Sequence, residues 1–359
     1  MILCWAVDFE GIGGEGSLAR SYAIKISSFF NEKAIVVTPQ KIYLIKKNRI
    51  LSMSRKKQRN NISMQESKYL FAQRFIYPFT GFFLLYSLKK KYKKRIYLNY
   101  LPLWLFPIFV FAKLGNFRLG PIVGGIFHWN KNRSIAANFF RIYLMGFCYR
   151  ISIIIIKFMN IDVLASSKSL NDYLRRHKIE PSAYSLNLNV SRQLFDKEII
   201  FRNKEFDFVF YYRDHPSKYP NSTKSCVSDL EKKGFKVLTF GERYINNNIQ
   251  QIGYVDREVL LRLFSRSKIF INIADNPENL TVFDSISQGC EVINITPFNY
   301  KDEYGIHYCE DLSIMSDFAA LTLQNLQYDK DRLIGIRSLI KKQQVIIDNQ
   351  INSYLQYLF

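Results

Sequence analysis

Short apolar runs alternate with helix-like stretches through the second half of the chain, and this alternation constrains the fold more than any other feature. Phe206–Tyr212 is typical of a strand, Ser222–Lys233 of a helix and Phe235–Phe240 of the next strand. The same alternation returns over residues 257–295, where Asp256 has the position of a helix N-cap. Strands that alternate with helices of about ten to fifteen residues form parallel βαβ units. We therefore predict an α/β fold with a doubly wound sheet in this half.

The first half shows the same alternation with longer insertions between the elements. Ile2–Val7 and Ala34–Val37 are expected to be strands on either side of a helix over Ser17–Phe30. Further strands are expected at Arg95–Tyr100, Pro121–Phe127 and Asp162–Ala165. A chain of 359 residues is long enough for two domains of ordinary size. We predict two Rossmann-like domains that face each other across a cleft: residues 1–180, a linker over 181–204, residues 205–330, and a C-terminal helix over 331–359 that returns to the first domain.

Cysteine usage and the first residues indicate the compartment. The five Cys residues are scattered without CxxC or CxxxC spacing, which argues against a disulfide framework and against a structural zinc site. The chain opens on a strand-like run interrupted by Asp8 and Glu10, without the basic start and the cleavage site of a signal peptide. Its longest uncharged apolar run, Leu101–Ala112, is well short of the roughly 20 residues that span a bilayer. We expect a cytoplasmic protein without a transmembrane helix.

Positive charge is concentrated in the first half of the chain. Residues 1–170 hold 27 Lys and Arg against 6 Asp and Glu, whereas residues 171–359 hold 24 of each, so the first part carries the whole net charge of +21. Such asymmetry predicts an anionic partner for one half only. Basic residues interleaved with aromatic ones suit an anionic membrane surface, and Tyr69–Tyr100 and Leu101–Lys113 are the segments expected to lie on it. A solvated basic face over an ordinary core is the alternative.

Two carboxylates follow an apolar run in the second half, one in the turn after it and one inside the short helix that comes next. Glu278 and Asp284 follow the apolar run Lys268–Ile273, and Gly289 ends the helix-like stretch. In a parallel sheet, ligands bind beyond the carboxyl ends of the strands, where helix N-termini point. Carboxylates placed there can accept hydrogen bonds from the hydroxyl groups of a sugar and of a ribose. Helix capping, which needs no ligand, is the alternative.

A second cluster, of opposite charge, follows the first strand of this half. Arg213 and Lys218 come shortly after Phe206–Tyr212. Arg offers a rigid fork for phosphate oxygens and Lys a mobile point charge, so the pair could clamp a diphosphate. An ordinary basic loop is the alternative. Cations after one strand and carboxylates after another predict a site for a nucleotide-diphosphate sugar.

These residues resemble the C-terminal domain of the GT-B fold glycosyltransferases, most nearly those of family 4. Arg213 and Lys218 match the cations of that family, and Gly253–Val255 matches a segment that ends near the nucleotide base. Glu278 matches the first acidic residue of the family and Asp284 the second. The resemblance implies that the two cations hold the donor diphosphate, that Glu278 contacts the donor sugar and that Asp284 binds the ribose. The expected donor-binding residues are Arg213, Lys218, Asp284, Gly13, Gly14, Val255, Asn279, Leu280 and Thr281.

The first half resembles the family in outline. Gly13 and Gly14 match the loop that opens the first helix near the donor phosphates, and His128 resembles the His that ends a strand near the sugar in this family. Five residues separate the two acidic positions, where retaining members of the family have seven, so Asn276 could instead take the place of the first Glu. Retention of the anomeric configuration is favoured, and an inverting route would need a general base from the N-terminal domain. The candidate catalytic residues are Glu278, His128, Asp8 and Glu10, with a structural histidine and a solvated turn as the alternatives for the last three.

We therefore predict a metal-independent glycosyltransferase of the hexosyltransferase type, because paired cations can stabilise a departing diphosphate in place of a metal ion. It would need no cofactor besides its nucleotide-sugar donor. The basic domain would bind the inner face of the cell membrane and take a lipid-linked saccharide acceptor, as in bacterial O-antigen, capsule or exopolysaccharide synthesis. A catalytically inactive, membrane-associated relative of these enzymes is the first alternative. A nucleic-acid-binding protein is the second, but no zinc finger or RNP-like motif supports it, and we expect no nucleic-acid partner.

Overall fold

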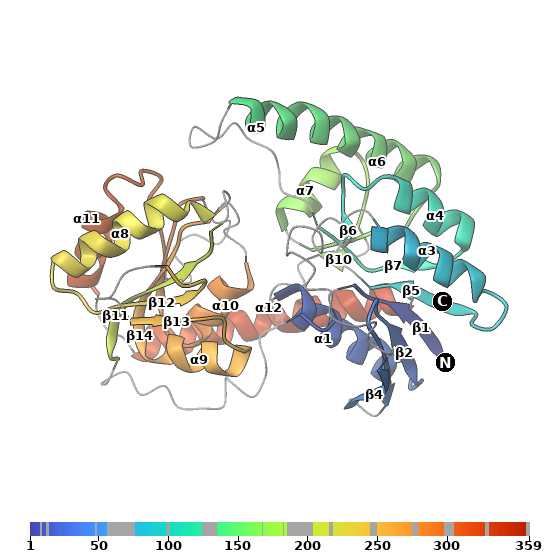
Figure 1. The fold of residues 1–359 in the computed structure, drawn as a ribbon, viewed down its shortest axis with the longest axis horizontal. Coiled ribbons are helices and arrows are strands. Elements are labelled where there is room, and N and C mark those ends of the chain that lie inside the picture. The colour runs from blue at the N-terminus through green and yellow to red at the C-terminus, as the bar shows by residue number, and fades with distance from the viewer. Residues whose placement is uncertain are drawn as a thin grey trace. The chain divides into compact units, whose positions relative to one another are not determined.

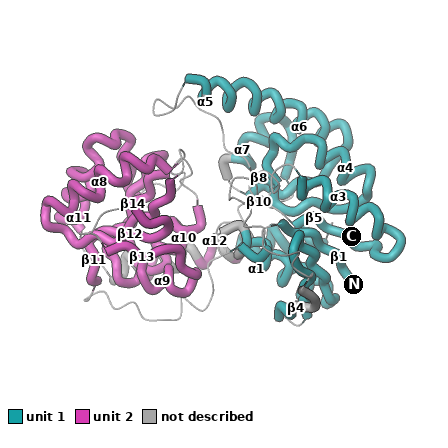
Figure 2. Tube along the Cα trace, viewed as in Figure 1, with its two compact units in different colours: residues 1–186, 346–359 teal, residues 187–345 magenta. Residues whose placement is uncertain are grey.

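The chain divides into two compact units. Unit 1 comprises residues 1–186 and 346–359, and unit 2 comprises residues 187–345 (Figures 1 and 2). The computed structural model describes residues 1–7, 9–11, 14–46, 49–55, 76–98, 101–123, 135–166, 168–181, 183–184, 204–214, 218–244, 250–274, 279–297, 305–326 and 330–356.

Unit 2 is built on a parallel sheet with the strand order β13-β12-β11-β14-β15-β16. Numbered along the chain, this order is 3-2-1-4-5-6, which is the arrangement of dinucleotide-binding Rossmann domains. The predicted doubly wound sheet is therefore confirmed. The strands are β11 (Phe206–Tyr212), β12 (Val237–Gly241), β13 (Gln250–Ile252), β14 (Ser267–Asn272), β15 (Glu291–Asn294) and β16 (Ile306–Tyr308).

Helices cover both faces of this sheet (Figure 1). Phe208 and Phe210 of β11 pack into one buried cluster with side chains of α8 and α11. On the opposite face, Phe264 of α9 packs on the rings of Phe240 and Phe270. A strand covered on both faces is apolar throughout, which is why β11 reads as a continuous apolar run. The helices are α8 (Pro220–Lys232), α9 (Arg257–Ser265), α10 (Leu280–Ser287) and α11 (Met315–Gln324).

Unit 1 contains a second Rossmann-like arrangement. One sheet has the order β4-β3-β2-β1-β5-β7, in which β3 and β4 form an antiparallel hairpin at the edge, and a parallel sheet has the order β10-β9-β8-β6. Only Gly120 separates β7 from β8, and a Cβ atom there would lie 2.9 Å from the carbonyl oxygen of Tyr97. The strands are β1 (Ile2–Trp5), β2 (Ala34–Val37), β3 (Lys41–Lys46), β4 (Arg49–Arg55), β5 (Lys94–Tyr97), β6 (Leu101–Pro102), β7 (Arg118–Leu119), β8 (Pro121–Val123), β9 (Leu164–Ala165) and β10 (Ala183–Tyr184).

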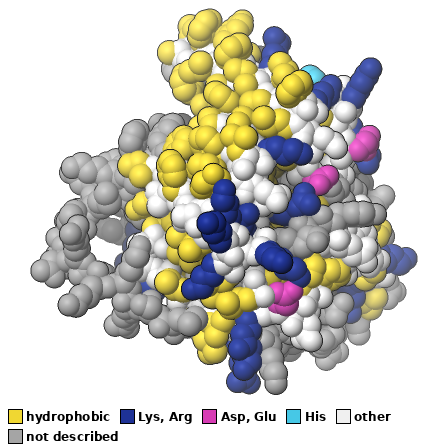
Figure 3. Space-filling view, turned by 90° about the vertical axis from the view of Figure 1, so that its right-hand side faces the viewer, with side chains coloured by type: hydrophobic (Ala, Val, Ile, Leu, Met, Phe, Trp, Pro, Cys, Tyr) yellow, Lys and Arg dark blue, Asp and Glu magenta, His cyan; other side chains and the backbone are white. Residues whose placement is uncertain are grey.

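The helices of unit 1 include one π-helical turn, η2 (Phe140–Met145), between α5 and α6. Helices α3 and α4 are joined through the stacked rings of Phe82 and Phe111, whose centroids lie 4.3 Å apart. On one face of the molecule, hydrophobic side chains gather at the surface beside Lys and Arg (Figure 3). The α-helices are α1 (Gly14–Phe29), α3 (Tyr77–Ser87), α4 (Pro107–Gly115), α5 (Ile135–Phe139), α6 (Gly146–Phe158) and α7 (Lys168–Arg176).

The apolar run over residues 101–113 belongs to the core of unit 1. Leu101, Leu103, Ile108 and Phe109 are all at most 1% exposed, so the expectation that this segment lies on a membrane is wrong for these side chains. An uninterrupted apolar run fits a covered strand and helix as well as it fits a bilayer surface, and periodicity alone does not separate the two. Within the described residues, every helix is too short or too polar to cross a membrane.

The chain ends on a long helix, α12 (Lys330–Gln356). Its residues up to 345 belong to unit 2 and those from 346 onward to unit 1. Ile351, Tyr354 and Leu355 are buried, and the Tyr354 hydroxyl donates a hydrogen bond of 2.5 Å to the carbonyl oxygen of Leu119. The last turns of α12 are therefore part of the core of unit 1. Most of the predicted linker lies outside the described residues, and Ala183–Tyr184 within it form β10.

Candidate functional site

The strand order of unit 2 indicates a binding site at one end of its strands. Strands β12 and β13 follow on one side of β11, whereas β14, β15 and β16 follow on the other. The chain connections therefore diverge between β11 and β14. Open α/β sheets bind their ligands at this switch point, beyond the carboxyl ends of the strands. The residues that follow β11, β12 and β14 lie at these carboxyl ends.

A cluster of polar side chains lies at this edge around the carboxylate of Glu242, which follows β12. Its Oε1 lies 3.8 Å from Nε of Arg213, the residue directly after β11. Oε1 also accepts a hydrogen bond of 2.9 Å from the Tyr254 hydroxyl, and Oε2 accepts one of 2.7 Å from the Asp214 backbone N–H. An anion thus gathers a guanidinium, a phenol and a backbone N–H, which are donors that phosphate oxygens also use. The sequence alone did not indicate that Glu242 belongs to the site, because neither its residue type nor its spacing from other residues distinguishes it.

Tyr211 brings the two predicted cations together. The Lys218 ammonium lies 5.6 Å from the centroid of the Tyr211 ring, and Arg213 is close enough to lower the pKa of the Tyr211 hydroxyl. Burial is the larger influence and raises that pKa. Burial, and then the hydrogen bond to Glu242, also raises the pKa of Tyr254, so both phenols keep their protons at neutral pH. The half-buried Val255 follows Tyr254 in the chain.

A chain of amide side chains ties β14 and β15 to the start of α10. Asn279 caps the helix, because its Oδ1 accepts a hydrogen bond of 3.0 Å from the backbone N–H of Val282. Its Nδ2 donates to Oδ1 of the buried Asn272 at 2.9 Å, and Nδ2 of Asn272 donates to Oδ1 of the buried Asn294 at 2.8 Å. The predicted donor-binding residues Leu280 and Thr281 form the first turn of α10, where backbone N–H groups favour an anion.

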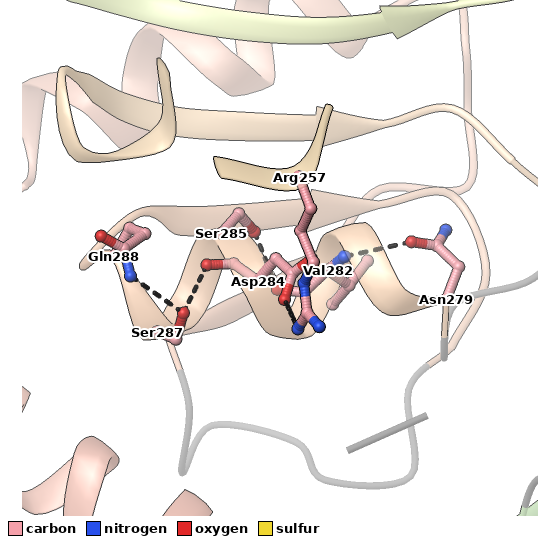
Figure 4. A network of polar contacts seen from close by, with 7 residues as sticks. All are labelled: Arg257, Asn279, Val282, Asp284, Ser285, Ser287 and Gln288. Carbon is pink, nitrogen blue, oxygen red and sulfur yellow. Dashed lines mark hydrogen bonds and ion pairs between the residues drawn. The ribbon is translucent and has the colours of Figure 1, made fainter. Parts of the chain in front are cut away.

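Asp284 lies inside α10 and is engaged by Arg257, the first residue of α9 (Figure 4). The carboxylate is 1% exposed, with Oδ1 2.7 Å from Nη2 and Oδ2 3.3 Å from Nε of the guanidinium. Burial raises the pKa of Asp284, and Arg257 acts in the opposite direction. The carboxylate expected to bind a ribose therefore has a protein partner in the described structure. Its role toward a ribose stays a prediction.

In unit 1, Glu10 lies after β1 within a local network. Its Oε1 accepts a hydrogen bond of 2.9 Å from the Thr38 hydroxyl, and its Oε2 lies 3.8 Å from the Lys41 ammonium. Burial, and then Glu10, raises the pKa of Tyr43 to about 12. These partners are those of a structural carboxylate, and its predicted role as a general base is not tested by them.

The loop after β1 is held from α1 by a residue that sequence reasoning missed. The guanidinium of Arg20 donates hydrogen bonds to the carbonyl oxygens of Phe9 at 2.6 Å and Gly11 at 2.9 Å. Gly14 begins α1. The predicted site residues Asp8, Gly13, His128 and Glu278 lie outside the described residues. Among the residues that are described, no group of three or more His, Cys, Asp or Glu is placed to hold a metal ion.

Two Rossmann-like units in one chain are typical of the GT-B fold, which confirms the predicted fold class of two Rossmann-like domains. Among solved structures the chain is similar to WaaG, a glycosyltransferase involved in lipopolysaccharide biosynthesis, at 9% identity and a TM-score of 0.58, over 99% of this chain and 100% of WaaG. It is also similar to the catalytic domain of Starch Synthase IV from Arabidopsis thaliana bound to ADP and acarbose, at 11% identity and a TM-score of 0.53, over 98% and 99% of the two chains.

The fold is shared with another kind of enzyme. A structure described as a UDP-N-acetylglucosamine 2-epimerase from Listeria monocytogenes matches at 8% identity and a TM-score of 0.51, over 94% of this chain and 90% of that one. The chain also spans 61% of the pneumococcal O-GlcNAc transferase GtfA, with 88% of its own length covered, at 12% identity and a TM-score of 0.45. No protein family description and no curated protein sequence matches the chain. At identities this low, structural similarity shows a shared fold and does not identify the reaction, which depends on the residues of the site.

Proposed function

We propose that this protein transfers a sugar from a nucleoside-diphosphate sugar to a membrane- or lipid-linked saccharide in the synthesis of a bacterial surface polysaccharide. The observation that carries the proposal is the pair of cations, Arg213 and Lys218, around Tyr211 at the switch point of unit 2. In such a transfer the bond between the sugar C1 and the diphosphate breaks, and an acceptor hydroxyl oxygen bonds to C1. The charge that develops on the leaving diphosphate is what two cations stabilise.

The same cations support a reaction without a metal ion, since they supply the positive charge that a metal would otherwise bring. Glu278 would position the donor sugar, and a retaining outcome is the favoured one. In an inverting reaction, a base among Asp8, Glu10 and His128 would take the proton of the acceptor hydroxyl. Glu10 would have to exchange its contacts with Thr38 and Lys41 for the acceptor hydroxyl in order to act as this base.

The acceptor is assigned to unit 1 because the net positive charge of the chain lies there. A saccharide linked to a lipid through a diphosphate is anionic and is presented at a membrane surface, which a basic domain suits. The likeness to WaaG, described as acting in lipopolysaccharide biosynthesis, supports this class of acceptor. We place the protein at the cytoplasmic face of the cell membrane.

One observation favours a second candidate, a donor-binding protein that does not catalyse transfer. The buried carboxylate of Asp284 is occupied by Arg257, although the resemblance assigns this carboxylate to the donor ribose. Binding without turnover would distinguish this candidate from an active transferase.

Nucleotide binding is tested by thermal unfolding with a panel of nucleoside diphosphates and their sugars, because a ligand of the folded state raises the midpoint. We expect one nucleotide to stabilise the protein and Arg213→Ala to weaken its binding about 10- to 100-fold, the range expected for loss of a charge-assisted hydrogen bond. Lys232→Ala is the matched control, because Lys232 lies in the last turn of α8, at the opposite edge of the sheet.

Turnover of the stabilising donor, measured with and without membrane lipid extract, then separates the two candidates. Release of the nucleotide that depends on Arg213 supports the transferase. Binding that depends on Arg213 without any turnover supports the non-catalytic protein. Absence of binding to every nucleotide would contradict both.

A further inference from the structure

The outward side of the continuous helical segment α5–η2–α6 carries large apolar side chains from its first residue to its last, with Arg150 and Lys157 among them in α6. Its large exposed side chains form what we call the apolar ridge, and their exposed fractions run from 49% for Phe140 and Leu144 to 88% for Phe158. The ridge consists of Ile135, Phe139, Phe140, Tyr143, Leu144, Phe147, Ile154 and Phe158. Eight neighbouring side chains of this size exceed the scattered apolar residues that any protein surface carries.

The inward side of the same segment is apolar as well. Tyr149, Ile153 and Ile156 of α6 are buried in the core of unit 1, at 5%, 5% and 2% exposure. A helix that buries apolar side chains on one side and carries large apolar side chains on the other normally contacts apolar material on both sides. Unit 1 covers the inward side of α6, so the ridge indicates a second apolar environment on the outward side.

Neighbouring helices extend this surface. Helix α4 contacts α6, and α3 contacts α4 through the Phe82–Phe111 stack. Leu114 of α4 is 67% exposed and Phe83 of α3 is 65% exposed. Figure 3 shows hydrophobic side chains gathered over one face of the molecule with Lys and Arg among and beside them.

The positive charge around the apolar ridge indicates which kind of partner covers it. Residues 67–161, which include α3 to α6, contain 15 Lys and Arg and no Asp or Glu. Lys113, Arg150 and Lys157 are exposed on the helices that carry the apolar surface. A second copy of this chain would bring the same positive charge against its own, whereas anionic lipid headgroups complement the charge and the acyl chains below them cover the apolar side chains.

We propose that the apolar ridge inserts into the headgroup region of a bilayer that contains anionic lipids, with the helices lying in the plane of the interface. Tyr143 and the Phe side chains suit this depth, because aromatic rings prefer the boundary between headgroups and acyl chains. This inference extends the proposed function, since it names the surface by which the protein reaches a membrane-linked acceptor. It does not depend on which sugar is transferred.

The test is co-sedimentation of the full chain with vesicles of phosphatidylcholine alone or mixed with phosphatidylglycerol, without donor or acceptor. We expect binding to the anionic vesicles that weakens as salt is raised. The triple variant Phe139→Ser/Phe147→Ser/Phe158→Ser should lower partitioning by about tenfold or more, because apolar area no longer leaves water on binding. The matched control is Tyr308→Ser/Ile314→Ser/Leu321→Ser, which removes three exposed apolar side chains of unit 2 and should bind as the unaltered chain does.

The charge contribution is tested separately with Lys113→Gln/Arg150→Gln/Lys157→Gln, which should lose most of the preference for anionic vesicles. Every altered side chain is exposed, so we expect all of these variants to fold. Their thermal unfolding midpoints check this expectation. Equal vesicle binding by the ridge variant and the unaltered chain would overturn the proposal. So would a chain that binds no vesicles but forms a dimer that the ridge variant dissociates, because the ridge would then contact a second copy.

Failure of this inference and failure of the proposed function give different results. A chain that binds vesicles through the ridge but turns over no donor contradicts the transferase alone. A chain that turns over a donor with a water-soluble acceptor but ignores vesicles contradicts the membrane surface alone.

Discussion

At the scale of single residues, the carboxylate of Asp284 is a buried charge that depends on its contact with Arg257. It is removed from water inside α10, and the two-pronged contact with Arg257 compensates for the lost hydration. We expect Arg257→Met to destabilise the protein by about 3–5 kcal/mol, because a buried charge loses its partner. Chemical denaturation at fixed pH measures this loss.

The loss should depend on pH in a definite direction. Without Arg257, burial alone acts on Asp284 and raises its pKa further, so the folded chain holds the proton at a pH where the unfolded chain releases it. Acid therefore stabilises the folded variant, and its deficit should be smaller at pH 5 than at pH 8. Adding Asp284→Asn should restore part of the stability and remove most of this pH dependence. A deficit that is independent of pH would contradict the assignment.

At the scale of elements, Lys204 joins the end of α10 to the sheet of unit 2. Lys204 as a whole is 9% exposed, and its ammonium donates hydrogen bonds to the carbonyl oxygens of Ser267 at 2.6 Å and Gly289 at 2.8 Å. Burial lowers its pKa, the nearby Glu291 acts in the opposite direction, and the hydrogen bonds to the carbonyl oxygens offset part of the cost of the buried charge. Gly289 follows α10 with a φ of 76°, a left-handed conformation that favours glycine.

Lys204→Met should therefore cost about 1–3 kcal/mol for each carbonyl oxygen left without its donor. The free energy of unfolding, measured with a denaturant, checks this. Lys232→Met serves as the control, because Lys232 is an exposed lysine on α8 and its replacement should change stability by less than about 0.5 kcal/mol. Equal stability of both variants would mean that other donors or water satisfy these carbonyl oxygens.

Elements with a strong local pattern were predictable, and those defined by distant contacts were not. Phe206–Tyr212 matches β11 residue for residue, and Asp256 caps α9 as expected by accepting a hydrogen bond from the Val259 backbone N–H. The β3–β4 hairpin was missed, because its charged and apolar residues lie on a mostly half-buried edge without a clear alternation. Short strands such as Gln250–Ile252 owe their conformation to the neighbouring strand and carry little local signal.

The candidate site shows the same division. Arg213 and Lys218 were predicted because cations shortly after a buried strand have a chemical meaning in a parallel sheet, and the structure places both beside Tyr211, while their role toward a donor stays a prediction. Glu242 and Arg257 were missed, because their importance lies in partners that are 29 and 27 residues away in sequence. Such pairs exist only once the sheet has assembled, so no window of sequence contains them.

At the scale of the whole molecule, α12 makes the stability of unit 1 depend on the last residues of the chain. Leu355 is fully buried, and we expect Leu355→Ala to cost about 2–5 kcal/mol through the cavity it leaves. The same change should leave the nucleotide affinity of unit 2 unaltered, because the affected core belongs to unit 1. Thermal unfolding and nucleotide titration of one sample test both parts. A variant that loses stability and nucleotide affinity together would show that the units are coupled.

The π-helical turn η2 has a consequence for changes in the length of this segment. A π-helical turn corresponds to an α-helix that has gained one residue, and each residue of an α-helix turns the chain by about 100°. Deleting a single residue within Phe140–Met145 would therefore restore regular α-helical turns and keep the facing of Ile135 and Phe139 relative to α6, whereas a deletion between Phe147 and Phe158 would rotate these two side chains relative to one another. The segment should therefore accept the loss of one residue at η2 more readily than a loss between Phe147 and Phe158, because the π-helical turn contains one residue more than a regular α-helix needs.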